Sequence, residues 1–190
     1  LGLAVALWTG RREHWLWRPE HLFLLLLGIV VLRLWLARRP VPAWRPRRVV
    51  AVGIAAYAVL FSFVTVTRHL TFATHALDLG YYVQLTWNLA RGAGPRVSLP
   101  EMHAWGDHLS PIMYLFVPAF WLAPGAVALL IALSVALALG AAAVFGLARA
   151  RLHDERPTAA FALLYLANPS LHRINMRDFH AAALTIPLLL

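Results

Sequence analysis

The sequence contains no cysteine and no lysine, and charged residues of either sign are scarce. The absence of cysteine excludes a disulfide framework and a metal site built on thiolates. Only 13% of the 190 residues are charged, whereas 61% are hydrophobic, and the mean hydropathy is +0.68. These values lie well outside the range of ordinary soluble domains. The composition therefore predicts an integral membrane protein.

The 17 basic residues, all of them arginine, outnumber the 8 acidic residues and give a formal net charge of +9. They lie at the ends of apolar runs rather than on one soluble basic face, which argues against nucleic acid as a partner. The H-E-x-x-H, P-loop, G-x-S-x-G and G-x-G-x-x-G motifs are also missing. The chain starts with Leu1 and stops inside the apolar run 181–190, so we expect a fragment of a longer protein.

Several apolar runs have the length of membrane-spanning helices, which need about 20 residues to cross roughly 30 Å of hydrocarbon. Four runs come close to this length, and we predict spanning helices at 21–37, 49–67 and 126–148. The run 112–123 is interrupted by Pro118 and would rise only about 18 Å as a helix. We therefore predict an all-α fold, a polytopic transmembrane helical bundle.

The arginine-rich loops predict how the chain is threaded through the membrane. The loop that holds Arg38, Arg39, Arg45, Arg47 and Arg48 is typical of the cytoplasmic side, and so is the loop 149–156. Both loops fall on that side only if 112–123 does not cross, so we predict a re-entrant or interfacial segment there. A short helix at 158–167, ended by Asn168 and Pro169, then returns the chain, which places 170–180 on the same side as Asp78.

The longest polar stretch, 68–111, is predicted to lie outside and to contain a short helix along the membrane surface. The apolar face of this helix comprises Leu79, Tyr82, Val83, Leu85 and Leu89. We expect Gly92, Gly94 and Pro95 to end it.

Three polar sites could carry chemistry, and each has an ordinary structural alternative. Asp78 could act as a base or simply stabilise a helix N-terminus. The sequence Asp107-His108-Leu109-Ser110 could be reactive or could mark a helix start before Pro111. Asp178 and His180 could share a metal or form a surface pair. All three sites are predicted on one membrane face, whereas His69, His75, His103 and His172 are interpreted as interfacial.

These motifs together resemble a prokaryotic membrane family of unknown function, DUF2079, from about residue 49 to the end of the chain. The resemblance rests on a series of short motifs in a fixed order: Asp78-Leu79-Gly80, Gln84 with Trp87-Asn88, His108-Leu109-Ser110-Pro111, Asn168-Pro169, and Asp178-Phe179-His180. Leu109 stands where the pattern of the family has phenylalanine.

The family is in turn similar to the GT-C membrane glycosyltransferases, which use sugars linked to polyprenyl phosphate. This resemblance implies an activity on the outer face of a prokaryotic cytoplasmic membrane, with membrane lipid and a polyprenyl-phosphate sugar donor as partners. It implies N-terminal transmembrane segments and a basic cytoplasmic loop over 1–48, and the start of a GT-C-like module over 49–190.

The resemblance also assigns roles to individual residues. Asp78 and Asp178 would be catalytic, and Asp178 and His180, with His108, would hold either a divalent metal ion as the cofactor or the phosphate. Arg68, Arg91 and Arg177 are the open choices for a contact to the departing phosphate. The implied substrate-binding residues are Gln84, Trp87, Asn88, His108 and Arg177.

Two other classes of function compete with a glycosyltransferase. In a transporter or flippase-like permease, a broken helix around Pro111, Pro118 and Pro124 would line the substrate path, but the sequence shows no inverted repeat and no ionisable residues at the midplane. In a non-catalytic membrane scaffold, the polar loop would only bind a partner protein.

Overall fold

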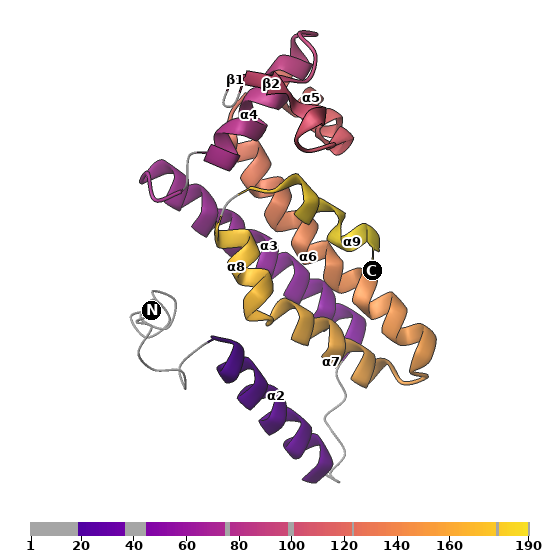
Figure 1. Cartoon of the computed structure of the whole chain (residues 1–190). Helices are drawn as coiled ribbons and strands as arrows, with labels where there is room; N and C mark the ends of the chain where they lie inside the picture. Colours follow the sequence, from indigo (N-terminus) through magenta and orange to yellow (C-terminus); the bar gives the residue numbers. More distant parts are fainter. Residues whose placement is uncertain are drawn as a thin grey trace.

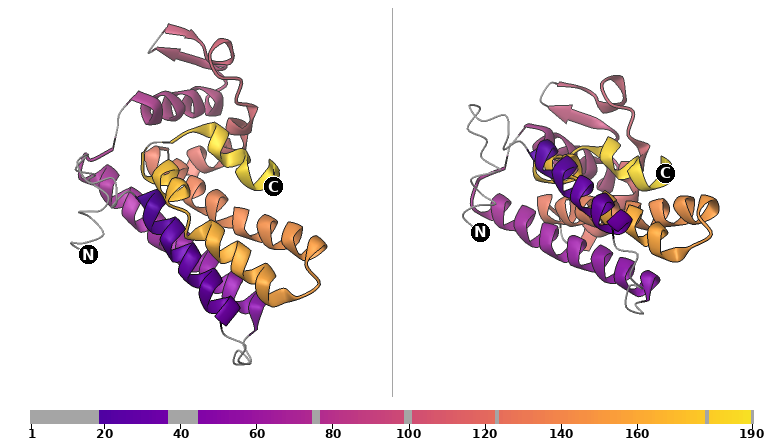
Figure 2. Two further views of the ribbon diagram at one scale, coloured as in Figure 1. Left: turned by 60° about the horizontal axis from the view of Figure 1, so that its bottom comes forward. Right: turned by 90° about the horizontal axis from the view of Figure 1, so that it is seen from below.

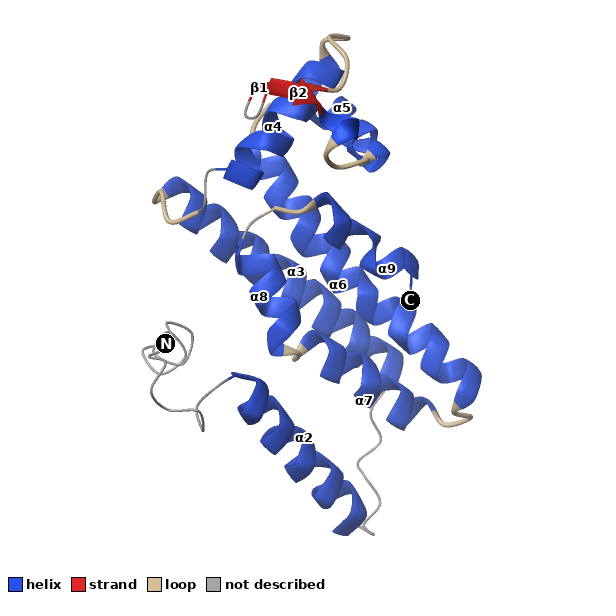
Figure 3. Cartoon of the chain, viewed as in Figure 1, coloured by secondary structure: helices blue, strands red, loops and turns tan. Residues whose placement is uncertain are grey.

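The computed structural model describes residues 19–36, 45–74, 77–98, 101–122, 124–177 and 179–189, and these are mostly helical (Figure 3). Asp178 and His75 lie outside the described residues. Two long helices, α3 (Pro46–Leu70) and α6 (Ala126–Arg151), pack side by side in opposite directions (Figure 1). With 25 and 26 residues they are long and apolar enough to cross a bilayer. The helices predicted at 49–67 and 126–148 are thus confirmed.

The outward faces of both long helices expose apolar side chains. On α3, Val52, Val59 and Phe63 are each about two-thirds exposed, at 68%, 71% and 69%. On α6, the exposed apolar residues recur at every fourth position, which puts them on one face of the helix: Val127, Ile131, Val135 and Leu139. A helix in the core of a soluble protein would bury such residues, whereas a bilayer covers them.

A third helix was predicted at 21–37, and α2 (Pro19–Leu36) lies there. This helix has 18 residues, so the predicted run is helical. Of the helices that the structure describes, α3 and α6 are long and apolar enough to cross a membrane. The helix α2 packs along α8 (Pro169–Arg177) at the side of the bundle (Figure 2).

The chain returns from the far end of α6 through α7 (Glu155–Leu166) and α8. The break between them falls at Asn168 and Pro169, as predicted, and Oδ1 of the Asn168 side chain accepts a hydrogen bond from the Ser170 backbone N–H at 2.9 Å. Because Pro169 starts a new helix, the return path continues toward the end of the molecule where α6 begins. The sequence pattern did not predict α8, which is followed by η4 (Ala181–Thr185) and α9 (Ile186–Leu189).

Close packing of α7 on α6 depends on Gly140. A Cβ at this position would collide with the hydroxyl and ring of Tyr165, whose hydroxyl donates a hydrogen bond to the Leu137 carbonyl at 2.9 Å. We expect Gly140→Ala to lower the free energy of unfolding by about 1 to 3 kcal/mol because Tyr165 must move. Thermal unfolding of the purified protein in detergent measures this loss. Gly146→Ala, in the same helix with open space around it, is the control, and equal stability of the two variants would contradict the packing.

A small lobe lies at the end of the bundle where α3 finishes and α6 starts (Figure 1). It consists of α4 (Leu77–Ala90), the antiparallel strands β1 (Arg96–Ser98) and β2 (Glu101–His103), the short turn η2 (Ala104–Gly106), and the segments η3 (Pro111–Phe116) and α5 (Val117–Leu122). The hairpin was not predicted. The two short segments η3 and α5 confirm that residues 112–123 do not form one full span.

The apolar face of α4 is covered by protein rather than by the membrane surface, which corrects the prediction. Leu79, Tyr82 and Leu85 are 3%, 4% and 0% exposed, because η3, α5, β1 and the start of α6 pack against this helix. An amphipathic pattern predicts that a face is buried but does not distinguish a lipid cover from a protein cover. Gly92 and Gly94, both at positive φ, end the helix region as expected.

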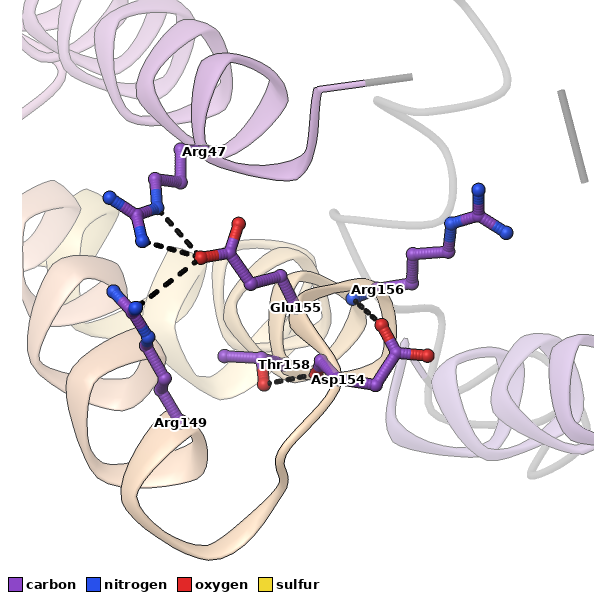
Figure 4. A network of polar contacts seen from close by, with 6 residues as sticks. All are labelled: Arg47, Arg149, Asp154, Glu155, Arg156 and Thr158. Atoms are coloured by element: carbon purple, nitrogen blue, oxygen red, sulfur yellow. Dashed lines mark hydrogen bonds and ion pairs between the residues drawn. The ribbon is translucent and has the colours of Figure 1, made fainter. Parts of the chain in front are cut away.

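The opposite end of the bundle gathers the arginine-rich segments. Arg47 at the start of α3 donates to Oε1 of Glu155 at the start of α7, with distances of 2.9 Å from Nε and 2.5 Å from Nη2. Arg149, near the end of α6, lies 3.6 Å from the same oxygen (Figure 4). The described arginines at the start of α3 therefore share one end of the bundle with the loop 149–156, as the threading prediction required.

Candidate functional site

The lobe end of the bundle brings together Asp78 and His180. Asp78 lies in the first turn of α4, and His180 immediately precedes η4, yet Nε2 of His180 lies 3.5 Å from Oδ2 of Asp78. Their side chains are 46% and 47% exposed, so the pair is accessible from outside. The return path through α7 and α8 creates this contact, because it carries the chain back to α4. One described residue from each of two predicted sites, Asp78 and His180, therefore contributes to this contact.

Tyr82 lies one helical turn after Asp78 and is 4% exposed. Its hydroxyl shares hydrogen bonds with the Ser110 side chain and the Ala181 backbone. Burial, together with the nearby carboxylates of Asp78 and Asp107, raises the pKa of the Tyr82 phenol, although the hydrogen bonds oppose this effect. The hydroxyl therefore stays protonated at neutral pH and joins three separate segments at one point.

A pocket of about 520 Å³ opens beside this point. It is lined by polar groups from three segments of the chain: Tyr82 from α4, Asp107, His108 and Ser110 from the loop before η3, and His180 and Thr185 from the C-terminal segment. Asp78 is not among the lining residues, but its carboxylate contacts His180, which is. Within the loop, Nε2 of His108 lies 3.8 Å from Oδ2 of Asp107. Such a set can accept protons, donate hydrogen bonds and hold a polar ligand.

Sequence reasoning missed Tyr82 as a site residue because its position fits the apolar face of α4. The available signal was its spacing of four residues from Asp78, which places both side chains on neighbouring positions of one helix face. Thr185 was also missed, because nothing in the sequence indicates that residues after His180 turn back toward the loop before η3.

Gln84 and Asn88 lie on another part of α4, against the hairpin. The Gln84 amide donates to Oγ of Ser98 and accepts from the Ser98 backbone N–H, both at 2.9 Å. The Asn88 amide donates to the Arg96 carbonyl at 2.7 Å. Neither residue lines the pocket beside Asp78. In this structure they fasten the hairpin to α4.

Trp87 and Arg177 also lie apart from the pocket lining. Trp87 is 37% exposed, and the guanidinium of Arg91 lies 4.0 Å from the centre of its ring. Arg177 is exposed at the end of α8, three residues before His180. The structure therefore places His108 and His180 in the lining of the pocket beside Asp78. The other described candidates lie outside this lining: Gln84, Trp87, Asn88 and Arg177.

The described residues do not form a metal site: no group of three or more His, Asp or Glu side chains gathers within the described parts of the chain. Asp78 and His180 supply two neighbouring donors. Asp178, the ligand expected together with His180, is outside the described residues.

A family model with the description "Predicted membrane protein (DUF2079)" matches residues 68–190. The chain belongs to this family. The DUF2079 region includes the whole lobe, α6, α7, α8 and every described residue that lines the pocket. It begins at Arg68 rather than near residue 49, where the resemblance was expected to start. No curated protein and no solved structure matches the chain.

Proposed function

We propose that this DUF2079 protein is a membrane glycosyltransferase that moves a sugar from a polyprenyl-phosphate donor to an acceptor hydroxyl on the outer face of the cytoplasmic membrane of a prokaryote. The observation that carries the proposal is the pairing of the Asp78 carboxylate with the His180 imidazole beside a pocket that contains polar side chains, at one end of an apolar bundle. A lipid-linked sugar needs this arrangement, because its tail stays in the bilayer while its phosphate and sugar reach the surface.

The location of the site supports the proposed orientation. The residues that line the pocket belong to the lobe and to the segment after α8. Figure 1 shows the lobe at one end of α3 and α6, and the start of α3 and the end of α6 at the other end. Because arginine-rich loops favour the cytoplasmic side, the pocket end is proposed to face outside.

The proposed reaction is a displacement at the anomeric carbon of the sugar. The acceptor oxygen bonds to this carbon while the bond from the carbon to the phosphate oxygen breaks, and polyprenyl phosphate leaves with the electron pair. Asp78 takes the proton of the acceptor hydroxyl as general base. His180, 3.5 Å from the carboxylate, orients it.

The other residues of the pocket are proposed to hold substrate. Asp107, Ser110 and Tyr82 offer hydrogen bonds to sugar hydroxyls, since each presents an oxygen at or beside the pocket. His108 and Arg177 are proposed contacts for the donor phosphate, for which a guanidinium provides charge-assisted hydrogen bonds.

The remaining sequence predictions enter the proposal in a weaker form. The side-chain amides of Gln84 and Asn88 form hydrogen bonds with the hairpin. We therefore propose that these residues affect substrate binding through the position of the hairpin. Trp87 stays a proposed substrate contact. A divalent metal held by Asp178 and His180 stays a proposal too, and because the described donors do not complete a metal site, no step of the reaction uses one.

Sugar transfer by the full-length protein tests the proposal. Membranes that contain the protein are supplied with a mixture of radiolabelled polyprenyl-phosphate sugars, and label that reaches a non-lipid or new lipid acceptor is separated by chromatography. We expect transfer that membranes without the protein do not show. Label that crosses the bilayer while still attached to its original lipid would instead indicate a flippase, and neither transfer nor crossing would indicate a scaffold.

The interior of the bundle gives the transport alternative little support. Its buried polar side chains are uncharged: Ser134 donates to Oδ1 of Asn175 at 3.0 Å, and the Asn175 amide faces the Tyr57 hydroxyl at 3.5 Å. These groups satisfy one another across α3, α6 and α8. A path for a charged substrate usually contains ionisable side chains at this depth.

A further inference from the structure

The arginine-rich end of the bundle is a separate charged surface, at the other end of α3 and α6 from the pocket. Three segments contribute to it: the start of α3, the end of α6 and the start of α7. In the described residues they carry six arginines, namely Arg45, Arg47, Arg48, Arg149, Arg151 and Arg156, against the two acids Asp154 and Glu155. We call this set the basic end. It holds an excess of four positive charges.

Both acids of the basic end are engaged within the protein. Glu155 accepts hydrogen bonds from Arg47 and pairs with Arg149, and the hydrogen bond from Arg47 lowers the pKa of its carboxyl group (Figure 4). Asp154 caps α7, because its Oδ1 accepts from the Arg156 backbone N–H at 2.9 Å. Neither carboxylate therefore neutralises the remaining guanidinium groups by direct contact.

Four arginines of the basic end remain for an outside partner. Arg45, Arg48, Arg151 and Arg156 are exposed, and their guanidinium groups make no ion pair or hydrogen bond with another described residue. Figure 4 shows the Arg156 side chain directed away from Arg47 and Arg149. Because these arginines come from several segments, they form one surface only in the folded bundle.

The position of the basic end indicates what kind of partner it binds. Its arginines flank the ends of the two helices that are long enough to cross a bilayer, so they lie at the level of the lipid headgroups. A guanidinium binds phosphate oxygens through paired, charge-assisted hydrogen bonds. The negative surface of a cytoplasmic leaflet attracts clustered arginines at this depth.

We propose that the basic end is a binding surface for the headgroups of anionic phospholipids in the adjoining leaflet. Two or more phosphates lie against Arg45, Arg48, Arg151 and Arg156, while the ion pairs of Glu155 with Arg47 and Arg149 hold α3, α6 and α7 in register. The surface is independent of the pocket and of the proposed sugar transfer. It ties the stability of the fold to the lipid composition of the membrane.

Thermal unfolding of the full-length protein in lipid nanodiscs tests this proposal. Wild type is compared in discs of phosphatidylcholine alone and in discs that contain one-third phosphatidylglycerol, and we expect a melting temperature several degrees higher with the anionic lipid. In the triple variant Arg48→Gln, Arg151→Gln and Arg156→Gln, at least half of this increment should disappear. For each variant, the increment is the melting temperature in the anionic discs minus the melting temperature of the same variant in phosphatidylcholine discs. A folding defect lowers both temperatures, so this difference reports lipid binding.

Two control variants accompany this test. The triple variant Arg48→Lys, Arg151→Lys and Arg156→Lys keeps the charge but loses the paired hydrogen bonds of the guanidinium groups, so it should keep more of the increment than the Gln triple variant. The double variant Arg91→Gln and Arg96→Gln removes arginines of the lobe end and should leave the increment in place. An equal increment in the Gln triple variant and wild type would overturn the proposal. So would the same stabilisation by soluble glycerol phosphate in phosphatidylcholine discs, which would identify a site for free phosphate.

Discussion

Replacement of Asp78 by asparagine is expected to reduce sugar transfer by about 100-fold or more, since a general base contributes roughly 10² to 10⁴ in rate. The amide of asparagine keeps the size of the side chain but cannot take the proton of the acceptor. Initial rates of transfer in membranes, at matched amounts of protein, measure the effect. The melting temperature should stay close to that of wild type, because the Asp78 side chain is 46% exposed and its contact with His180 lies at the surface.

Glu101→Gln provides the matched control for this experiment. Glu101 is an exposed acid of the same lobe, on β2, but it does not line the pocket beside Asp78. The control should transfer sugar at the rate of wild type. Wild-type rates in Asp78→Asn would remove Asp78 from the proposed role and with it the main support for a glycosyltransferase.

Filling the pocket is expected to have the second largest effect. Ala182 lines the pocket and is exposed, so a tryptophan there extends into the space of about 520 Å³ without disturbing the core. We expect Ala182→Trp to lower kcat/KM for the donor at least tenfold, mainly through a higher KM, because the lost volume excludes substrate. Rates over a range of donor concentrations provide both constants.

Ala93→Trp tests whether any large apolar residue near the lobe has the same effect. Ala93 is exposed between Gly92 and Gly94, and it does not belong to the pocket lining. This variant should keep the KM of wild type. An unchanged KM in Ala182→Trp would show that substrate does not enter this pocket, even if Asp78 proves essential.

The helices could be predicted from the sequence where one physical requirement dominates. Length and apolarity indicate α3 and α6, because about 20 apolar residues match the thickness of a bilayer. Pro169 marks the break between α7 and α8, since proline cannot continue the backbone hydrogen bonds of a helix. The arginine-rich pattern correctly predicted that the start of α3 and the loop 149–156 share one end of the bundle.

The predictions failed where the outcome depends on which surfaces meet. The apolar face of α4 was expected on the membrane, but η3 and α5 cover it. Gln84 and Asn88 stay predicted substrate contacts, but the sequence did not predict the hairpin to which their amide groups bond. Tyr82 was counted as apolar packing although its hydroxyl faces Ser110 and Ala181. In each case the partner comes from a distant or irregular segment.

The sequence by itself determined that this is a membrane protein, that two of its runs, α3 and α6, are long and apolar enough to span, and which acids are candidates for chemistry. These properties follow from the transfer of side chains between water and lipid, which depends on local composition. Only the tertiary structure decided that Asp78 meets His180, that Tyr82 joins them at a pocket, and that Glu155 binds two arginines. Such contacts arise from the path of the chain through α6, α7 and α8, because residues far apart in sequence become neighbours only when the helices pack.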